Sequence, residues 1–176
     1  MKLCIYALCK NEIEYIEKWL ESVKQADEII VVDTGSTDGT WEVLQKSNVK
    51  CYQKIFEPYR SDTAKNYALS LVPNDTDICL PLDIDMELYP NCISELKTYW
   101  EKDLTILYYK QYFKTSNSYG KLCAHSRNNC RWIYPSFEQI AFKGKYKTLN
   151  KVLLTHFTKF EHEKAKEIFK TQKLFI

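Results

Sequence analysis

Glycine is scarce in this chain of 176 residues, which contains only 4 of them. The sequence has no Gly-x-Gly-x-x-Gly fingerprint, no Gly-rich loop ending in Lys-Ser or Lys-Thr, and no Gly-x-Ser-x-Gly elbow. These absences exclude the dinucleotide-binding Rossmann loop, the P-loop of NTPases and the α/β-hydrolase nucleophile. Any chemistry that the chain performs must come from a different arrangement of residues.

Paired cysteines are also missing. The 7 cysteines are odd in number and scattered, and no Cys-x-x-Cys occurs, which argues against a zinc site or a disulfide framework. The apolar start, Leu3 to Leu8, is too short for a signal sequence or a membrane span. Free cysteines suit a reducing compartment, so we expect a cytoplasmic protein.

The chain lacks any strong excess of one charge. Its formal net charge is +2 and it contains no basic block, so no nucleic-acid partner is expected. With 45% hydrophobic and 27% charged residues it has an ordinary globular composition. A length of 176 residues predicts one domain, spanning 1–176, with a substantial core.

One stretch organises the rest of the chain. The β-branched run from Ile29 to Val32 predicts a strand buried on both faces, and it stops at Asp33. Turn residues follow, and Ser36 or Thr37 would cap the next helix. Asp33 therefore stands at the carboxyl end of a central strand, where open α/β sheets bind ligands. It would either accept hydrogen bonds from a ribose or base, or cap its own turn.

Strands and helices alternate through the first hundred residues. This pattern predicts a mostly parallel α/β sheet flanked by helices. After residue 103 the pattern changes to an aromatic-rich strand and a hairpin, so a small antiparallel portion is expected in the C-terminal half. The expected strands are 3–8, 29–32, 49–53, 78–82, 104–113, 121–126 and 152–157, and the main expected helices are 12–23, 62–71 and 161–175.

Two carboxylates, Asp83 and Asp85, end another buried strand. Aspartate oxygens suit Mn²⁺ or Mg²⁺, and such an ion commonly also holds substrate phosphates. With Asp33 they would place three carboxylates at one sheet edge, which would repel each other without a cation or hydrogen-bond donors. The alternative is an ordinary pair of loop aspartates.

The order of these motifs resembles that of the family 2 glycosyltransferases, which have the GT-A fold. Residues 9–12 are similar to that family's opening Lys-Asn-Glu segment, and 30–40 match its Val-Val-Asp-x-Gly-Ser-Thr-Asp-Gly-Thr almost letter for letter. Residues 60–66 resemble its Arg-x-Asp-x-Ala-Arg-Asn segment, and 77–85 the strand ending in Leu-Asp-x-Asp. Residues 127–140 and 153–157 resemble its later Arg-Trp, His-Glu-Gln and His segments.

The resemblance implies a metal-dependent inverting transferase that moves a sugar from a nucleoside-diphosphate sugar, usually a UDP-sugar, to a hydroxyl. It implies that Glu138 is the catalytic base and that Asp85, Asp83 and His156 hold Mn²⁺ or Mg²⁺. Residues 1–100 would bind the donor, and 101–176 the base and a glycan, lipid-linked glycan or protein acceptor. The implied donor-binding residues are Ala7, Cys9, Asn11, Glu12, Asp33, Ser36, Arg60, Lys65, Asp83 and Ile84.

Two positions depart from the family pattern. Met86 replaces a glutamate, with Glu87 one place later, and Phe137 replaces the histidine before the base. A non-catalytic domain that binds sugar nucleotides is therefore one alternative, and a nucleotidyltransferase is another. The lysine-rich helix expected at 161–175 would dock on the domain itself, or contact a membrane surface or a partner. A homo-oligomer would be a further way to complete an acceptor site.

Overall fold

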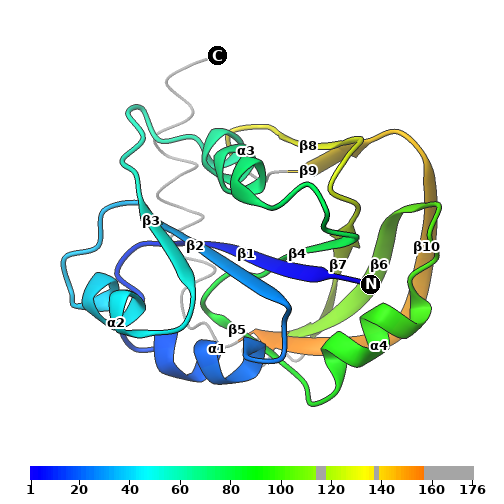
Figure 1. Cartoon of the computed structure of the whole chain (residues 1–176), viewed down its shortest axis with the longest axis horizontal. Helices are drawn as coiled ribbons and strands as arrows, with labels where there is room; N and C mark the ends of the chain where they lie inside the picture. The colour runs from blue at the N-terminus through cyan, green and yellow to red at the C-terminus, as the bar shows by residue number, and fades with distance from the viewer. Residues whose placement is uncertain (114–117, 137–138, 157–176) are drawn as a thin grey trace.

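A computed structural model of the chain describes residues 1–113, 118–136 and 139–156. Within these ranges eight strands form one sheet in the order β3-β2-β1-β4-β7-β6-β10-β5, and β8 and β9 form a separate pair (Figure 1). In chain order the strands are β1 Leu3–Cys9, β2 Glu28–Asp33, β3 Lys50–Gln53, β4 Ile78–Pro81, β5 Met86–Leu88, β6 Leu104–Phe113, β7 Ser118–His125, β8 Cys130–Ile133, β9 Gln139–Phe142 and β10 Lys145–His156.

The strand pairing changes character halfway along the chain. β1 pairs in parallel with β2 and β4, and β2 pairs in parallel with β3. β7 is antiparallel to β6 and β4, and β10 is parallel to β6 but antiparallel to β5. This arrangement confirms the predicted α/β class, with a parallel first half and antiparallel pairing in the C-terminal half.

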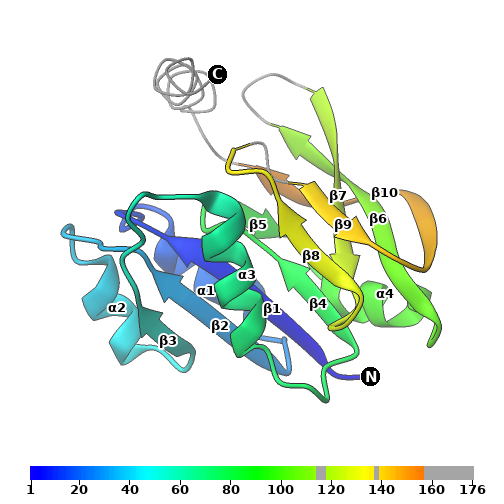
Figure 2. The same cartoon turned by 90° about the horizontal axis from the view of Figure 1, so that it is seen from above.

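The helices cover the sheet on both faces. They are α1 Ile16–Val23, α2 Thr40–Lys46, α3 Ser61–Leu71 and α4 Cys92–Tyr99. The buried apolar residues of α1, α2 and α4 belong to one hydrophobic cluster, whereas Ala68 and Leu69 of α3 pack in a second cluster together with Trp132 of β8. α3 accordingly lies on the opposite side of the sheet from α1 and α4 (Figure 1), and Figure 2 shows it running alongside β8.

The central strand β1 divides its side chains between the two cores. Leu3 and Ile5 point into the cluster with α1, and Cys4 and Tyr6 into the cluster with α3. Side chains of a strand alternate between faces, so a strand covered by helices on both sides is apolar throughout. This is why the uninterrupted apolar run at the start of the chain correctly predicted a central strand.

The structure corrects the start of the first helix and the cap of the second. The expected helix 12–23 begins at Ile16, because a turn comes first in which the Glu12 carbonyl accepts the N–H of Tyr15 at 3.0 Å. The predicted caps Ser36 and Thr37 are wrong, since α2 starts later. Its N-cap position is Gly39, which has φ 98°, a conformation that favours glycine.

Several strand predictions also change. β5 was not expected, and the segment 131–140, expected to be irregular, contributes most of β8 and the start of β9. β10 starts at Lys145, seven residues before the predicted last strand, and Phe157 lies outside the described residues, as does the predicted helix 161–175. No helix within the described ranges has the length and apolar content needed to span a membrane.

Candidate functional site

A cleft of about 590 Å³ opens where β1 and β4 end, beside the first turns of α3. Cys9, Thr34, Lys65, Asp83 and Asp85 are among the residues that line it. The carboxyl ends of parallel strands meet at one edge of a sheet, which is where open α/β sheets bind ligands. The cleft therefore lies at the carboxyl ends of the parallel strands, where the sequence predicts that a ligand binds.

Asp33 is fully buried at the end of β2 and holds the turn that follows it. Its Oδ1 accepts the backbone N–H groups of Gly35 at 2.9 Å and Ser36 at 3.0 Å, and the Cys9 thiol lies 3.5 Å from Oδ2. Burial acts to raise the pKa of Asp33, but hydrogen bonds from Ser36, Gly35 and Gln53 outweigh it and hold that pKa below its ordinary value. Asp33 therefore caps its own turn, and contact with a base stays a prediction.

Asn11 and Ser36 join the loops that follow β1 and β2 by hydrogen bonds. The Asn11 N–H donates to Ser36 Oγ at 2.9 Å, and Asn11 Oδ1 accepts the Thr37 N–H at 2.8 Å. The Glu12 N–H donates to Thr40 Oγ1 at 2.9 Å. Asn11 adopts φ 58°, a left-handed conformation that asparagine tolerates. These bonds give Asn11, Glu12 and Ser36 a role in shaping the loops after β1 and β2.

Asp83, Ile84 and Asp85 all line the cleft. The Ile84 side chain is only 2% exposed and packs in the hydrophobic core. The Met86 N–H donates to the Asp83 carbonyl at 3.0 Å and closes a turn around the pair. Ile84 therefore acts as the anchor that keeps the two carboxylates at the cleft. Ile84 also lines the cleft, and its contact with the donor stays a prediction.

Lys65 faces the same carboxylates from α3. Its ammonium lies 3.5 Å from Asp83 Oδ1 and 4.7 Å from the centre of the Trp132 ring. Residues 61–71 form a regular helix, so Lys65 reaches the cleft from a fixed backbone. A cation between an aromatic face and a carboxylate is held by two attractions at once. No local pattern predicts that Trp132 supports this lysine, because 67 positions of sequence separate the two residues.

The carboxylate pair is suited to a hard divalent cation. Mg²⁺ is usually held by one or two carboxylates, with waters and substrate phosphates completing its coordination, so Asp83 and Asp85 form a chemically adequate donor set. Among the described residues, no group of three His, Cys, Asp or Glu side chains converges as a metal site. The residues present therefore fit an ion that is completed by a bound phosphate ligand, and not a closed protein cage.

The remaining candidates for chemistry are placed only in part. The backbone of His156 pairs with Met86 across β10 and β5, which puts it beside the residue that follows Asp85. The His156 side chain and the predicted base Glu138 lie outside the described part of the structure. The strand register is thus compatible with a site shared by Asp85 and His156.

Two further candidates, Ala7 and Arg60, are not among the residues that line the cleft. Ala7 is 2% exposed and packs in the hydrophobic core. Arg60 forms a two-pronged ion pair with Asp62, with donor–acceptor distances of 3.2 and 2.9 Å, and it lines a different cavity. Contacts of these two residues with a sugar nucleotide remain predictions.

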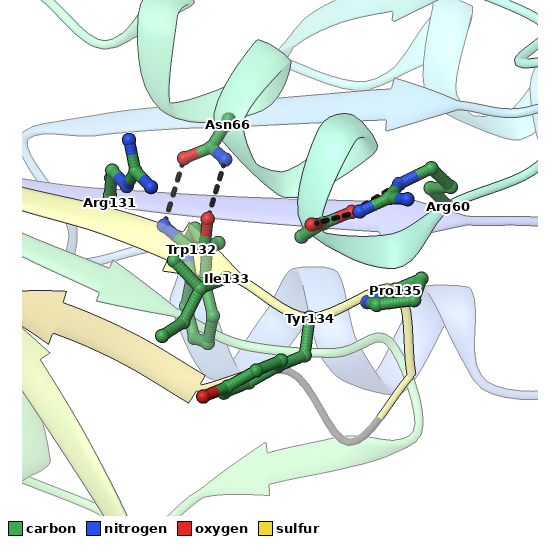
Figure 3. Close-up of a pocket in the computed structure, with 8 residues that line it drawn as sticks. Arg60, Asn66, Arg131, Trp132, Ile133, Tyr134 and Pro135 are labelled. Atoms are coloured by element: carbon green, nitrogen blue, oxygen red, sulfur yellow. Dashed lines mark hydrogen bonds and ion pairs between the residues drawn. The ribbon is translucent and has the colours of Figure 1, made fainter. Parts of the chain in front are cut away.

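That second cavity, of about 570 Å³, lies between the start of α3 and the end of β8. Arg60, Asp62, Asn66, Arg131, Trp132 and Tyr134 help to line it (Figure 3). The Asn66 amide bonds the Trp132 backbone twice, donating to its carbonyl at 2.8 Å and accepting its N–H at 2.9 Å. These two hydrogen bonds hold β8 against α3.

The amino-acid sequence of this chain is similar to those of known proteins. Residues 4–165 match the model of the family described as glycosyl transferase family 2. The lipopolysaccharide core biosynthesis glycosyltransferase LpsC of Rhizobium meliloti is 34% identical over 92 residues, which are 50% of this chain and 33% of LpsC. An uncharacterized glycosyltransferase of Rickettsia conorii is 34% identical over 97 residues, 54% of this chain and 33% of that protein. The matched segment spans about a third of the length of these relatives.

Solved structures resemble the whole fold. TarS of S. aureus has a TM-score of 0.71 at 15% identity, covering 99% of this chain and 39% of TarS. Glucosyl-3-phosphoglycerate synthase from Mycobacterium tuberculosis, solved with Mn²⁺, uridine diphosphate and glucosyl-3-phosphoglycerate, scores 0.67 at 15% identity, covering 98% of this chain and 76% of that one. These likenesses confirm the predicted GT-A fold. Together with the family match over residues 4–165, they establish that the chain belongs to glycosyl transferase family 2.

Proposed function

We propose that this protein transfers a sugar from a nucleoside-diphosphate sugar to a hydroxyl group of an acceptor. The observation that carries the proposal is the meeting of Asp83, Asp85 and Lys65 in one cleft at the carboxyl edge of the sheet. Two carboxylates and one cation suit a ligand that combines phosphates with a divalent metal. The family membership supports the same reaction class.

The proposed metal is Mn²⁺ or Mg²⁺, held by Asp83 and Asp85, with His156 as a further ligand. Such an ion, when bound, stabilises the negative charge that develops on the departing diphosphate. The Lys65 ammonium, close to Asp83, would contact the same phosphates. Support comes from the structurally similar synthase, which was solved with Mn²⁺ and uridine diphosphate. We therefore propose a UDP-sugar as donor.

Glu138 is the proposed catalytic base in a single inverting displacement. Its carboxylate takes the proton of the acceptor hydroxyl while the oxygen–carbon bond forms at the anomeric carbon and the bond from that carbon to the diphosphate breaks. Cys9, Asn11, Glu12, Asp33 and Ser36 would shape the nucleoside end of the site through the loops that they hold. The proposed acceptor is a glycan, free, lipid-linked or carried by a protein.

The proposal covers residues 1–176 as one functional domain, with the donor bound mainly by residues 1–100. The seven cysteines all have free thiols, which supports work in a reducing compartment such as the cytoplasm. Contact of residues 161–175 with a membrane surface or a partner is a further part of the proposal. Self-association that completes the acceptor site is another. Co-sedimentation with liposomes, compared between the full chain and a chain lacking 161–176, tests the membrane contact directly.

A product assay separates the proposed reaction from its alternatives. The protein is incubated with a panel of nucleoside-diphosphate sugars, glycan acceptors and Mn²⁺, and the released nucleotide is measured. We expect release of a nucleoside diphosphate that Asp85→Ala abolishes. Pyrophosphate release would indicate a nucleotidyltransferase. Tight sugar-nucleotide binding with neither transfer nor hydrolysis would indicate the non-catalytic domain, which the departures Met86 and Phe137 favour.

A further inference from the structure

Helix α3 separates the two cavities along its first two turns. Ser61 and Lys65 line the cleft, whereas Asp62 and Asn66 line the second cavity. Residues four apart lie on one face of a helix, so each pair marks one face and the two faces adjoin. Trp132 belongs to both surroundings. Its ring contacts Lys65, which lines the cleft, and Trp132 itself lines the second cavity. The second cavity is therefore the immediate neighbour of the proposed donor site.

The second cavity carries an excess of positive charge. Asp62 balances Arg60 through their two-pronged ion pair, whose hydrogen bonds also hold the pKa of Asp62 below its ordinary value. Arg131 adds a second guanidinium in an exposed position, and the structure records no ion pair for it within the described ranges. One cationic group is thus left to attract a ligand, and its planar fork suits phosphate and carboxylate oxygens.

The cavity also offers an aromatic surface on a held backbone. Tyr134 is 56% exposed and adopts φ 73°, a left-handed conformation that is uncommon for a bulky residue. Its neighbour Pro135 is fixed by the Ser61 N–H, which donates to the Pro135 carbonyl at 3.1 Å. Figure 3 shows Tyr134 on the side of the cavity opposite Asn66. An exposed ring between held segments provides a stacking face for a sugar.

We propose that the second cavity binds the acceptor and selects one that carries an anionic group, a phosphate or a carboxylate, on or next to the sugar that accepts. Arg131 binds the anionic group and Tyr134 stacks on the sugar ring. Arg60 keeps its place through Asp62 and forms the far wall. This inference rests on the proposed transferase function, because it gives the neighbouring cavity the second substrate of that reaction.

Binding of small glycosides to the full-length protein tests the proposal without turnover. Three probes are titrated into isotopically labelled protein in the presence of a chelator: a methyl hexoside, the same hexoside carrying a 6-phosphate, and the corresponding methyl hexuronide. NMR shifts of the Asn66 side-chain amide and of the Trp132 and Tyr134 backbone amides report on the second cavity. We expect the two anionic probes to bind at least about tenfold more tightly than the neutral one.

Arg131→Gln should remove that preference, and Lys46→Gln, which changes an exposed basic residue of α2, should leave it intact. A phosphate-only preference identifies a phosphorylated acceptor, and a preference for both probes identifies a general anionic acceptor. Equal binding of all three probes, or a preference that survives Arg131→Gln, would overturn the inference. Nucleotide binding in the cleft, measured on the same samples after Mg²⁺ is added in excess of the chelator, reports separately on the proposed function.

Discussion

The Trp132 indole N–H donates a hydrogen bond to the Tyr6 hydroxyl at 2.8 Å, joining β8 to the central strand β1 across 126 positions of sequence. The Tyr6 hydroxyl lies 2.8 Å from His125 Nε2, and His125 Nδ1 lies 2.7 Å from the Ser126 carbonyl. A carbonyl only accepts, so Nδ1 carries the proton, Nε2 accepts from Tyr6, and every donor points the same way. This buried chain fixes the indole that supports Lys65 at the cleft.

Removing the Tyr6 hydroxyl should lower the stability of the folded protein. Tyr6→Phe leaves the Trp132 N–H and the His125 Nε2 buried without their partner, so we expect the free energy of unfolding to fall by about 1–3 kcal/mol. Urea denaturation followed by fluorescence measures it. Tyr109→Phe is a matched control: Tyr109 is also buried, but its hydroxyl has no hydrogen-bond partner within the described part of the chain. An equal loss of stability in both variants would contradict the role of the hydrogen bonds.

His125, the last side chain in this row of hydrogen bonds, predicts a dependence of stability on pH. Burial, with a smaller effect from Arg127, lowers the pKa of His125 from its ordinary value near 6.5 to about 4. Between these values the unfolded chain binds the proton and the folded chain does not. This histidine therefore favours unfolding increasingly as pH falls from about 6.5 to 4, by at most about 1.4 kcal/mol per pH unit. In His125→Gln the stability should fall less steeply over that range, and an unchanged slope would contradict the low pKa.

Lys65 should matter for nucleotide affinity. Lys65→Met removes the cation beside Asp83, so we expect the dissociation constant of a nucleoside diphosphate with Mn²⁺ to rise about tenfold or more, measured by calorimetry. Lys54→Met is the matched control, because Lys54 also lies over an aromatic ring, 4.1 Å from the centre of Tyr67. Equal weakening in both variants would mean that Lys65 does not contact the phosphates.

The sequence predicted the central sheet well because each of its main strands is a continuous apolar run that can be recognised without knowing its partners. One such run ends at Asp33 and another ends before Asp83. Both strands are covered on both faces of the sheet, and a strand covered in this way needs apolar residues without interruption. β5, with three residues, and β8 and β9, with four each, are too short to show a period, and pairing partners distant in sequence stabilise them.

The site was predicted less completely, for the same physical reason. Asp83, Asp85 and Lys65 belong to recognisable segments and do meet in one cleft. The contact of Lys65 with Trp132 and the placement of Arg60 in the second cavity depend on how α3 packs against β8, which no local spacing encodes. The turn role of Asp33 was one of two alternatives, and only the hydrogen bonds to Gly35 and Ser36 show it.

Glu138 provides a test of chemistry apart from binding. Glu138→Gln keeps the shape of the side chain but cannot take a proton, so we expect donor affinity within about twofold of the wild type and transfer reduced by at least about a hundredfold. Glu87→Gln is the control, since Glu87 is an acidic residue two positions after Asp85 in the sequence. Near wild-type turnover in Glu138→Gln would show that another group is the base.

The central claim is that Asp83 and Asp85 hold a metal that holds a nucleotide. Its most direct test is the melting temperature with a panel of nucleoside diphosphates and sugar nucleotides, with and without Mn²⁺, for the wild type and Asp85→Ala. A ligand that binds the native state raises the melting temperature by mass action. We predict a rise for uridine diphosphate or its sugars that requires Mn²⁺ and disappears in Asp85→Ala. No rise with any nucleotide, or the same rise in the variant, would contradict the account.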